Sequence, residues 1–264
     1  MCHVCGCDSH DTHEHVHADG TRHRHAHAGE HVHLEARILA KNDGLAARNR
    51  AWLGERKVVA LNLMGAPGCG KTSLLERSIR DLRGSAPVLV LEGDQATAND
   101  AERVRAAGAA VVQINTGTGC HLDASMVAKG LVELDPPAGA LVVIENVGNL
   151  VCPALFDLGE TRRVVVLSVT EGDDKPLKYP HMFRAADLVI LSKTDLLPHV
   201  EFDPQRAARH ARELNPAVEV IELSARRGAG LQAWYAWLQK DSLTAVSGPS
   251  SVQSTPAGSK LSLA

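Results

Sequence analysis

The chain has 264 residues, a formal net charge of −3, six cysteines and 14 histidines. This length suits one large domain, or one domain with tails, since domains commonly run to about 100–200 residues. The near-neutral charge gives no indication of a nucleic-acid surface, and no run approaches the ~18 apolar residues of a membrane span. We therefore expect neither nucleic acid nor membrane as a partner. Without the basic start and apolar stretch of a signal peptide, the protein is predicted to be cytoplasmic, where structural disulfides are rare.

The first 33 residues differ in composition from the rest. They hold ten of the 14 histidines and three of the six cysteines. Their five acidic and two basic side chains account for the whole net charge. Because the segment has no periodic apolar residues, it cannot bury enough surface to offset its ordering entropy. Residues 1–33 are therefore predicted to be a metal-binding tail that is disordered without metal.

Three thiols lie at the start of this tail, on Cys2, Cys5 and Cys7. Thiolates are soft ligands that suit Zn²⁺, Ni²⁺ and Cu(I), and no second cysteine pair lies nearby to complete a four-cysteine zinc module. Removal of Met1 would give Cys2 a free amine, and three sulfurs with one nitrogen could then form a planar Ni²⁺ site. The histidines that follow would bind several late-transition metals and act as a store.

Residues 34–240 alternate short apolar runs with helical patterns. Strands buried on both faces are nearly all apolar, so the alternation predicts an α/β domain with a mostly parallel sheet flanked by helices. Residues 241–264 are rich in Ser, Thr, Pro and Gly and are predicted to be a disordered tail. We expect strands at 58–64, 88–92, 110–114, 140–145, 164–169, 188–191 and 218–223. We expect helices at 34–53, 71–83, 98–107, 123–133, 204–214 and 231–240.

Residues 65–72 read G-A-P-G-C-G-K-T, which is the G-x-x-x-x-G-K-[ST] pattern between a predicted strand and a predicted helix. The backbone N–H groups of such a loop form an anion nest, to which the helix start adds its positive dipole end. Lys71 would contact the β- and γ-phosphates, and the Thr72 hydroxyl would bind Mg²⁺. The other predicted nucleotide contacts of this segment are Gly65, Gly68, Cys69, Gly70 and Ser73.

The base is indicated by Lys193 and Asp195, which follow a late predicted strand. Asp195 can accept hydrogen bonds from the N1–H and the exocyclic amine of guanine, a donor pair that adenine lacks, and Lys193 can lie along the base plane. Ser224 and Ala225 resemble the base-supporting SA loop of GTPases. Together these residues favour GTP; the alternative is an ordinary polar turn that ends a strand.

Two carboxylates lie at or just after the ends of other predicted strands. Glu145 ends a strongly apolar strand, where a Walker-B acid would hold Mg²⁺ or its water, and Gly148 could contact the γ-phosphate. Asp94 could orient the attacking water or bind Mg²⁺, or it could only cap a turn. Because phosphoryl transfer needs mainly positioning and charge neutralisation, the predicted catalytic residues are Lys71, Asp94 and Glu145.

A second set of metal-binding side chains lies inside the domain. Cys120 and His121 follow the third predicted strand and Cys152 follows the fourth, at the carboxyl ends that face the ligand in this architecture. The three are too few to close a tetrahedral site in one chain. They could bind Zn²⁺ or Ni²⁺ with water or be completed across a dimer, or they could be two buried thiols and an unrelated histidine. Cys152 is only seven residues from Glu145, which connects such a site to the loop that would sense the γ-phosphate.

Taken together, these motifs resemble the HypB-type hydrogenase maturation GTPases over residues 1–240. The resemblance implies a SIMIBI-class P-loop G domain that hydrolyses GTP and forms a homodimer when GTP is bound. It implies Ni²⁺ or Zn²⁺ at Cys120, His121 and Cys152 at the dimer interface. It also implies partnership with a HypA-type nickel metallochaperone and delivery of nickel to a [NiFe]-hydrogenase large-subunit precursor. The resemblance rests on the cysteine motif, the histidine tract, the phosphate loop and residues 93–94, 119–121, 145–153 and 191–198.

Three alternatives stay open from the residues. A urease accessory GTPase has a similar fold and metal, but does not share the tail thiols or the Cys120–His121 pair in this arrangement. A nickel-storage protein with a vestigial GTPase would still support hydrogenase maturation after Lys71→Ala. A nucleotide kinase would need an acceptor-binding lid, and none is evident. Lys175 could contact the GTP of a second subunit, or it could be part of a solvated charged loop.

Overall fold

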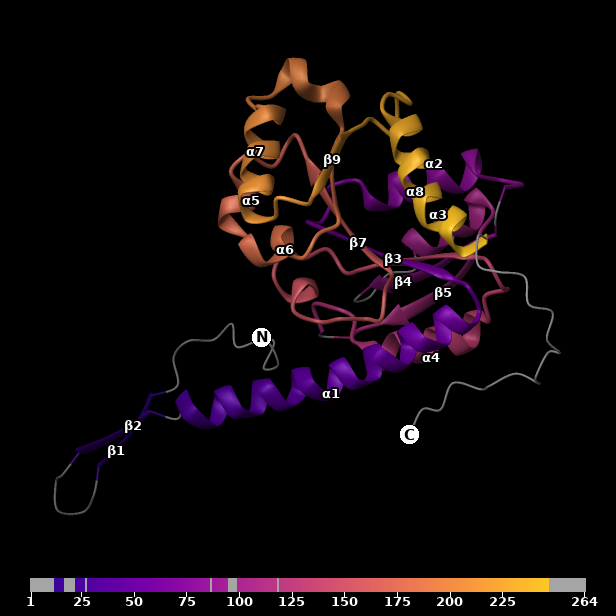
Figure 1. The fold of residues 1–264 in the computed structure, drawn as a ribbon. Helices are drawn as coiled ribbons and strands as arrows, with labels where there is room; N and C mark the ends of the chain where they lie inside the picture. Colours follow the sequence, from indigo (N-terminus) through magenta and orange to yellow (C-terminus); the bar gives the residue numbers. More distant parts are fainter. Residues whose placement is uncertain are drawn as a thin grey trace.

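The computed structural model describes residues 12–16, 22–26, 28–85, 87–94, 99–117 and 119–246. The predicted tail ligands Cys2, Cys5 and Cys7 lie outside this part of the chain. Seven strands form one sheet in the order β5-β4-β6-β3-β7-β8-β9, and Figure 1 shows helices on both of its faces. The predicted architecture, a parallel sheet flanked by helices, is confirmed.

The strands of this sheet correspond to the seven apolar runs of the sequence, and every adjacent pair is parallel. Because parallel strands end at one edge, the loops that follow them converge there. The pairing of Leu63 with Glu145 brings the strand before the phosphate loop into register with the predicted Walker-B acid. The strands are β3 (Val59–Gly65), β4 (Val88–Asp94), β5 (Ala110–Asn115), β6 (Leu141–Glu145), β7 (Arg162–Ser168), β8 (Leu188–Ser192) and β9 (Glu219–Glu222).

The long helices also follow the sequence pattern. The structure adds short helices after strand ends, which are too short to show a 3.6-residue period. The long helices are α2 (Lys71–Asp81), α3 (Asn99–Ala107), α4 (Ala124–Leu134), α7 (Pro204–Leu214) and α8 (Leu231–Val246). The short ones are η1 (Cys152–Ala154), α5 (Lys175–Lys178), α6 (Pro180–Arg184) and η2 (Thr194–His199).

Helix α1 spans Ala28–Glu55 and is longer than the helix expected at 34–53. Figure 1 shows its amino-terminal half extending away from the sheet. Within the histidine-rich segment, β1 (Thr12–Val16) and β2 (Arg22–Ala26) pair antiparallel. The domain boundaries expected at residues 33 and 240 thus fall inside α1 and α8. The dependence of the amino-terminal segment's order on metal stays a prediction.

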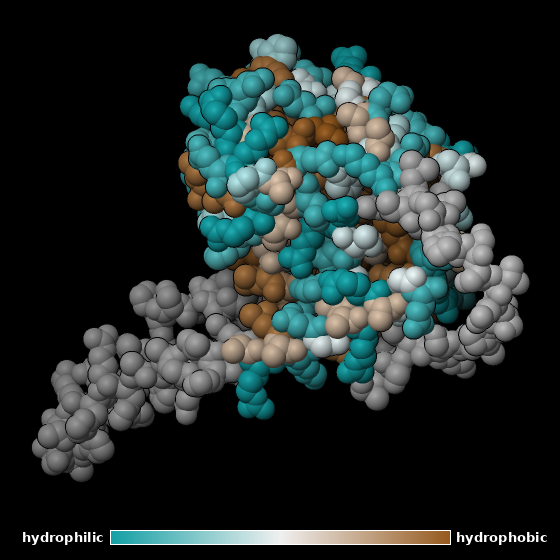
Figure 2. All heavy atoms as spheres, in the orientation of Figure 1, coloured by the Kyte–Doolittle hydropathy of each residue, from teal (hydrophilic) through white to brown (hydrophobic). Residues whose placement is uncertain are grey.

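Alternate strand residues build hydrophobic layers on the two faces of the sheet, as a sheet covered on both sides requires. Leu61 and Val166 pack with α2, α3 and α8 on one face. On the other, Ile144 packs with α1 and α4, and Val165 packs with α6 and α7. Figure 2 shows hydrophilic side chains over most of the visible face, with small hydrophobic patches between them. No helix in the described part of the chain is long and apolar enough to span a membrane.

Candidate nucleotide and metal sites

The phosphate loop joins β3 to α2 at the carboxyl edge of the sheet. Its first residue, Gly65, has a φ of +153°, and a Cβ there would lie 2.4 Å from the carbonyl oxygen of Val166. Only glycine therefore lets the loop turn this close to β7. The Lys71 Nζ donates hydrogen bonds to the carbonyl oxygens of Gly65 and Ala66, both at 3.2 Å. The lysine thus lies along the inside of the loop, where phosphate oxygens would be bound.

Thr72 and Glu145 lie in direct contact, although they come from α2 and β6. The Thr72 hydroxyl donates a hydrogen bond of 2.6 Å to Oε1 of Glu145. The Glu145 side chain is 4% exposed, and its Oε2 is buried without a hydrogen-bond partner among the described residues. Burial raises the pKa of Glu145 to about 7, against the opposing effects of Thr72 and Lys71. A hydroxyl beside a carboxylate with an unused oxygen is the oxygen donor set that fits Mg²⁺.

A cavity of about 480 Å³ lies beside these two residues. Its lining includes Lys71, Asp94 and Glu145, so the structure brings the three predicted catalytic side chains to one cavity. Gly148 lines it from the loop after β6, and a Cβ there would lie 2.9 Å from Cα of Pro67. The loop after β6 therefore packs directly against the phosphate loop.

Three charged residues also line the cavity that were not predicted from the sequence: Glu92 on β4, and Asp100 and Arg103 on α3. Burial, with the nearby Glu145 and Asp94 carboxylates, raises the pKa of Glu92 to about 8. A signal was present for Glu92, because residues two apart on a strand share one face and Asp94 had been singled out. Arg103 carried no such signal, because a single arginine on a short helix is typical of a solvated surface.

A second hollow of about 210 Å³ adjoins the first and shares Gly70, Ser73 and Lys193 with it. Lys193 Nζ donates to the carbonyl oxygen of Gly68 at 2.6 Å. The predicted base-binding residues Asp195, Ser224 and Ala225 line this hollow.

The Asp195 carboxylate is hydrogen-bonded to Ser224, which also lines the hollow. The Ser224 hydroxyl donates to Oδ1 of Asp195 at 2.6 Å, and this hydrogen bond lowers the pKa of Asp195. Asp195 is therefore anionic at neutral pH, and the Ser224 hydroxyl fixes the orientation of its carboxylate. An oriented carboxylate is what accepting two hydrogen bonds from a guanine base requires.

Cys120, His121 and Cys152 lie together, although they come from two loops. The Sγ atoms of Cys120 and Cys152 are 2.9 Å apart, and Cys120 Sγ is 3.7 Å from Nδ1 of His121. All three potential ligand atoms lie within 4.8 Å of one another. Burial lowers the pKa of His121, which favours the neutral imidazole that binds metals. The ring of Phe156 stacks on His121, with centroids 4.0 Å apart.

Two contacts connect this cluster to the nucleotide cavity. Asn149 forms an isolated antiparallel bridge with Gly65 of the phosphate loop. The Asn146 Oδ1 accepts a hydrogen bond from the backbone N–H of Leu122, the residue after His121. The segment between Glu145 and Cys152 is therefore in contact with both sites.

Two further predicted positions lie apart from the cluster. Cys69 is buried in the phosphate loop, with its Sγ 4.0 Å from the Lys71 Nζ. Lys175 begins α5, with its Nζ 5.2 Å from the ring centroid of Tyr179. Its contact with a second subunit's GTP stays a prediction.

The family model described as CobW/HypB/UreG, nucleotide-binding domain, matches residues 59–222. The chain belongs to this family. It is 56% identical over 209 residues to the hydrogenase maturation factor HypB of Azotobacter vinelandii, covering 79% of this chain and 69% of that protein. The resemblance to HypB-type proteins is thus confirmed. HypB proteins are GTPases, so the predicted activity, hydrolysis of GTP to GDP and phosphate, is confirmed with it.

Solved structures of HypB proteins have the same fold. HypB from Archaeoglobus fulgidus superposes with a TM-score of 0.71 at 43% identity, covering 76% of this chain and 98% of that one. HypB from Helicobacter pylori, solved in complex with nickel, gives a TM-score of 0.73 at 36% identity and covers 80% and 100% of the two chains.

Proposed function

We propose that this HypB-type GTPase is a nickel metallochaperone that delivers nickel during the maturation of a [NiFe]-hydrogenase. The observation that carries the proposal is the Cys120–His121–Cys152 cluster, whose loops contact the nucleotide cavity through residues 146–149. The names of the relatives support the pathway, and the nickel complex of the Helicobacter pylori protein supports the metal.

In this proposal the cavity beside the phosphate loop binds the triphosphate. The loop's N–H groups and Lys71 neutralise phosphate charge, and Asp94 orients the attacking water. Thr72, Glu145 and Asp94 would hold Mg²⁺, which would neutralise the charge that develops on the β- and γ-phosphates. The contacts of the loop glycines, Cys69 and Ser73 with the phosphates, and of Gly148 with the γ-phosphate, belong to the same proposal.

The cluster binds nickel as its cargo. Ni²⁺ and Zn²⁺ both accept thiolate and imidazole ligands, so the same three side chains suit either metal. Three protein ligands leave at least one coordination position, which water or a second copy of the chain fills. The proposed homodimer, formed when GTP is bound, would place two such clusters at its interface.

Hydrolysis gates the cluster through the loop after β6. Loss of the γ-phosphate shifts residues 146–149, and because these contact both the phosphate loop and Leu122, the separation of Cys120 and Cys152 changes with them. Nickel then passes to a partner, either the hydrogenase large-subunit precursor or a HypA-type metallochaperone. The amino-terminal cysteines and histidines serve as the nickel store, and the whole process takes place in the cytoplasm.

The proposal is tested by complementation of a strain that lacks this protein. We expect the Cys120→Ser and His121→Ala chains to leave the hydrogenase without nickel, and excess Ni²⁺ in the medium to restore its activity. His210→Ala is the matched control, because His210 lies on α7, where its Nδ1 is 3.4 Å from Oε2 of Glu213 on the same helix, and it should mature the enzyme normally. Normal maturation with Cys120→Ser, or a defect that nickel does not relieve, would contradict the proposal.

A further inference from the structure

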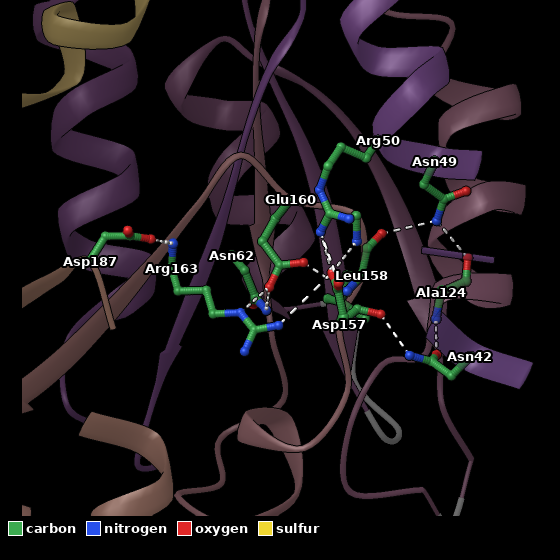
Figure 3. Close-up of polar contacts among 11 residues, drawn as sticks. Asn42, Asn49, Arg50, Asn62, Ala124, Asp157, Leu158, Glu160, Arg163 and Asp187 are labelled. Atoms are coloured by element: carbon green, nitrogen blue, oxygen red, sulfur yellow. Dashed lines mark hydrogen bonds and ion pairs between the residues drawn. The ribbon is translucent and has the colours of Figure 1, made fainter. Parts of the chain in front are cut away.

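We infer that Asn42 and Asn49 of α1 are positioning residues that set the separation of the two loops carrying Cys120, His121 and Cys152. The inference rests on the proposed metal site and adds residues outside it. Figure 3 shows both amides reaching from α1 to the start of α4 and to residues 157–158. Their side chains are buried, at 4% and 1% exposed.

Each amide bridges the same two segments. Asn49 Nδ2 donates to the carbonyl oxygens of Ala124, at 2.8 Å, and Leu158, at 3.0 Å. Asn42 Nδ2 donates to the carbonyl oxygen of Asp157 at 2.7 Å, while its Oδ1 accepts from the backbone N–H of Ala124 at 2.9 Å. Because an amide group is planar and rigid, two bonds from one amide fix the distance between the segments that they join.

Both segments adjoin the proposed ligands. Ala124 begins α4 and lies three residues after His121. Asp157 and Leu158 lie five and six residues after Cys152, and the residue before them, Phe156, supports the His121 ring by stacking. A substitution of Asn49 would therefore alter the positions of both segments that adjoin the cluster, although Asn49 is not itself a metal ligand.

The backbone of α1 lies in close contact with the segment at residues 157–159, which follows Cys152. Gly159 has a φ of +86°, and a Cβ there would lie 2.5 Å from the carbonyl oxygen of Ala46 and 2.6 Å from Cβ of Asn49. Nη2 of Arg50, one residue further along α1, donates to both carboxylate oxygens of Asp157, at 2.7 and 2.8 Å. Helix α1 is thus held against the 157–159 segment at consecutive positions. The same helix begins at Ala28 inside the histidine-rich segment, so it joins the two metal-binding regions of the chain.

The test uses the full chain with Cys2, Cys5 and Cys7 replaced by serine, so that its only thiols are Cys69, Cys120 and Cys152. Ni²⁺ is titrated against a chelator, and the thiolate-to-nickel charge-transfer absorption is followed, to which histidines contribute nothing. The same chain with Cys120→Ser and Cys152→Ser added is the blank, which gives the absorption without the proposed metal site. The variants are Asn49→Ala and, as a second variant if the first does not fold, Asn42→Ala.

Asn215→Ala is the matched control. The Asn215 amide also donates to two backbone carbonyls, of Ala186 at 2.8 Å and Arg184 at 3.4 Å, but it adjoins neither metal-bearing loop. We expect Asn49→Ala to weaken nickel binding about tenfold, as loss of a group that orients ligands does, and to alter the absorption band. Asn215→Ala should bind nickel within twofold of the parent affinity and show the parent absorption band. We expect this even if its melting temperature falls as much as that of Asn49→Ala.

An unchanged affinity and band in the asparagine variants of α1, or an equal loss in Asn215→Ala, would overturn the inference while leaving the metal site intact. A band that persists in the Cys120→Ser, Cys152→Ser blank would instead overturn the proposed metal site, and the inference with it.

Discussion

The side-chain oxygen of Asn146 lies 3.2 Å from the backbone nitrogen of Leu122, whose N–H it accepts. Asn146 follows Glu145 and lines the nucleotide cavity, and Leu122 follows His121. The Nδ2 of Asn146 donates in turn to Oδ1 of Asn62 on β3, also at 3.2 Å. One buried amide thus connects the predicted magnesium ligand, the central strand and the loop that carries two of the three ligands of the metal cluster.

Replacement of Asn146 by alanine should uncouple the two sites. Without the amide, a shift of the loop after β6 no longer reaches Leu122 directly, so nickel affinity should respond less to the bound nucleotide. GDP affinity should change by no more than a few-fold, because Lys71 and Asp195 are untouched. Nickel titrations with GDP and with a nonhydrolysable GTP analogue measure the response. An unchanged response would show that coupling runs elsewhere, for example through the Gly65–Asn149 bridge.

Glu145→Gln should lower GTP hydrolysis by about 100-fold or more, since removal of one charge-stabilising group from a phosphoryl-transfer site has effects of this size. The glutamine keeps the shape of the side chain and can still contact Thr72, so the loss would come from the missing negative charge. Glu213→Gln, on α7, is the control and should hydrolyse GTP normally. Steady-state phosphate release measures both, and a rate near the parent's in Glu145→Gln would remove this residue from the proposed magnesium site.

Asp195→Asn should change the base preference. Guanine presents two donors to the carboxylate, whereas xanthine has a carbonyl in place of the exocyclic amine, which an asparagine amide can bind. Loss of one charge-assisted hydrogen bond costs about 1.5–3 kcal/mol, so GTP affinity should fall roughly tenfold to a hundredfold while affinity for xanthosine triphosphate rises. Competition with a fluorescent nucleotide measures both affinities. A variant that still prefers GTP would indicate that Asp195 does not contact the base.

Asp173→Asn should lower stability at neutral pH more than at acid pH. Burial opposes ionisation of Asp173, but the hydrogen bond of 2.5 Å from Arg206 and that from the Asp203 N–H lower its pKa below the ordinary value. The stabilisation from a lowered carboxyl pKa is complete above the unfolded-state pKa and is lost as pH falls through the folded-state pKa. Melting temperatures of the parent and the variant should therefore converge below about pH 4. A difference that is constant from pH 7 to pH 3 would argue against this ion pair.

The sheet and both candidate sites were predictable for one physical reason. Parallel strands end at one edge, so Glu145 at the end of β6 was expected to lie near the loops after β3, β5 and β6. Those loops lead to Lys71, Cys120 and Cys152 respectively. The contacts made by Asn42 and Asn49 were not predictable, because an asparagine on an amphipathic helix is typical of a solvated face. Likewise, the first turns of α1 lie among histidines and lack the apolar period that marks a helix.

The central claim is that bound nucleotide controls nickel binding at Cys120, His121 and Cys152. The most direct measurement is the nickel affinity of the chain with Cys2, Cys5 and Cys7 replaced by serine, titrated with GDP and with a nonhydrolysable GTP analogue. We expect the two dissociation constants to differ at least about fivefold, as a coupling free energy of 1 kcal/mol or more gives, and the difference to disappear in Cys120→Ser. Equal nickel affinities in the two nucleotide states would contradict the account.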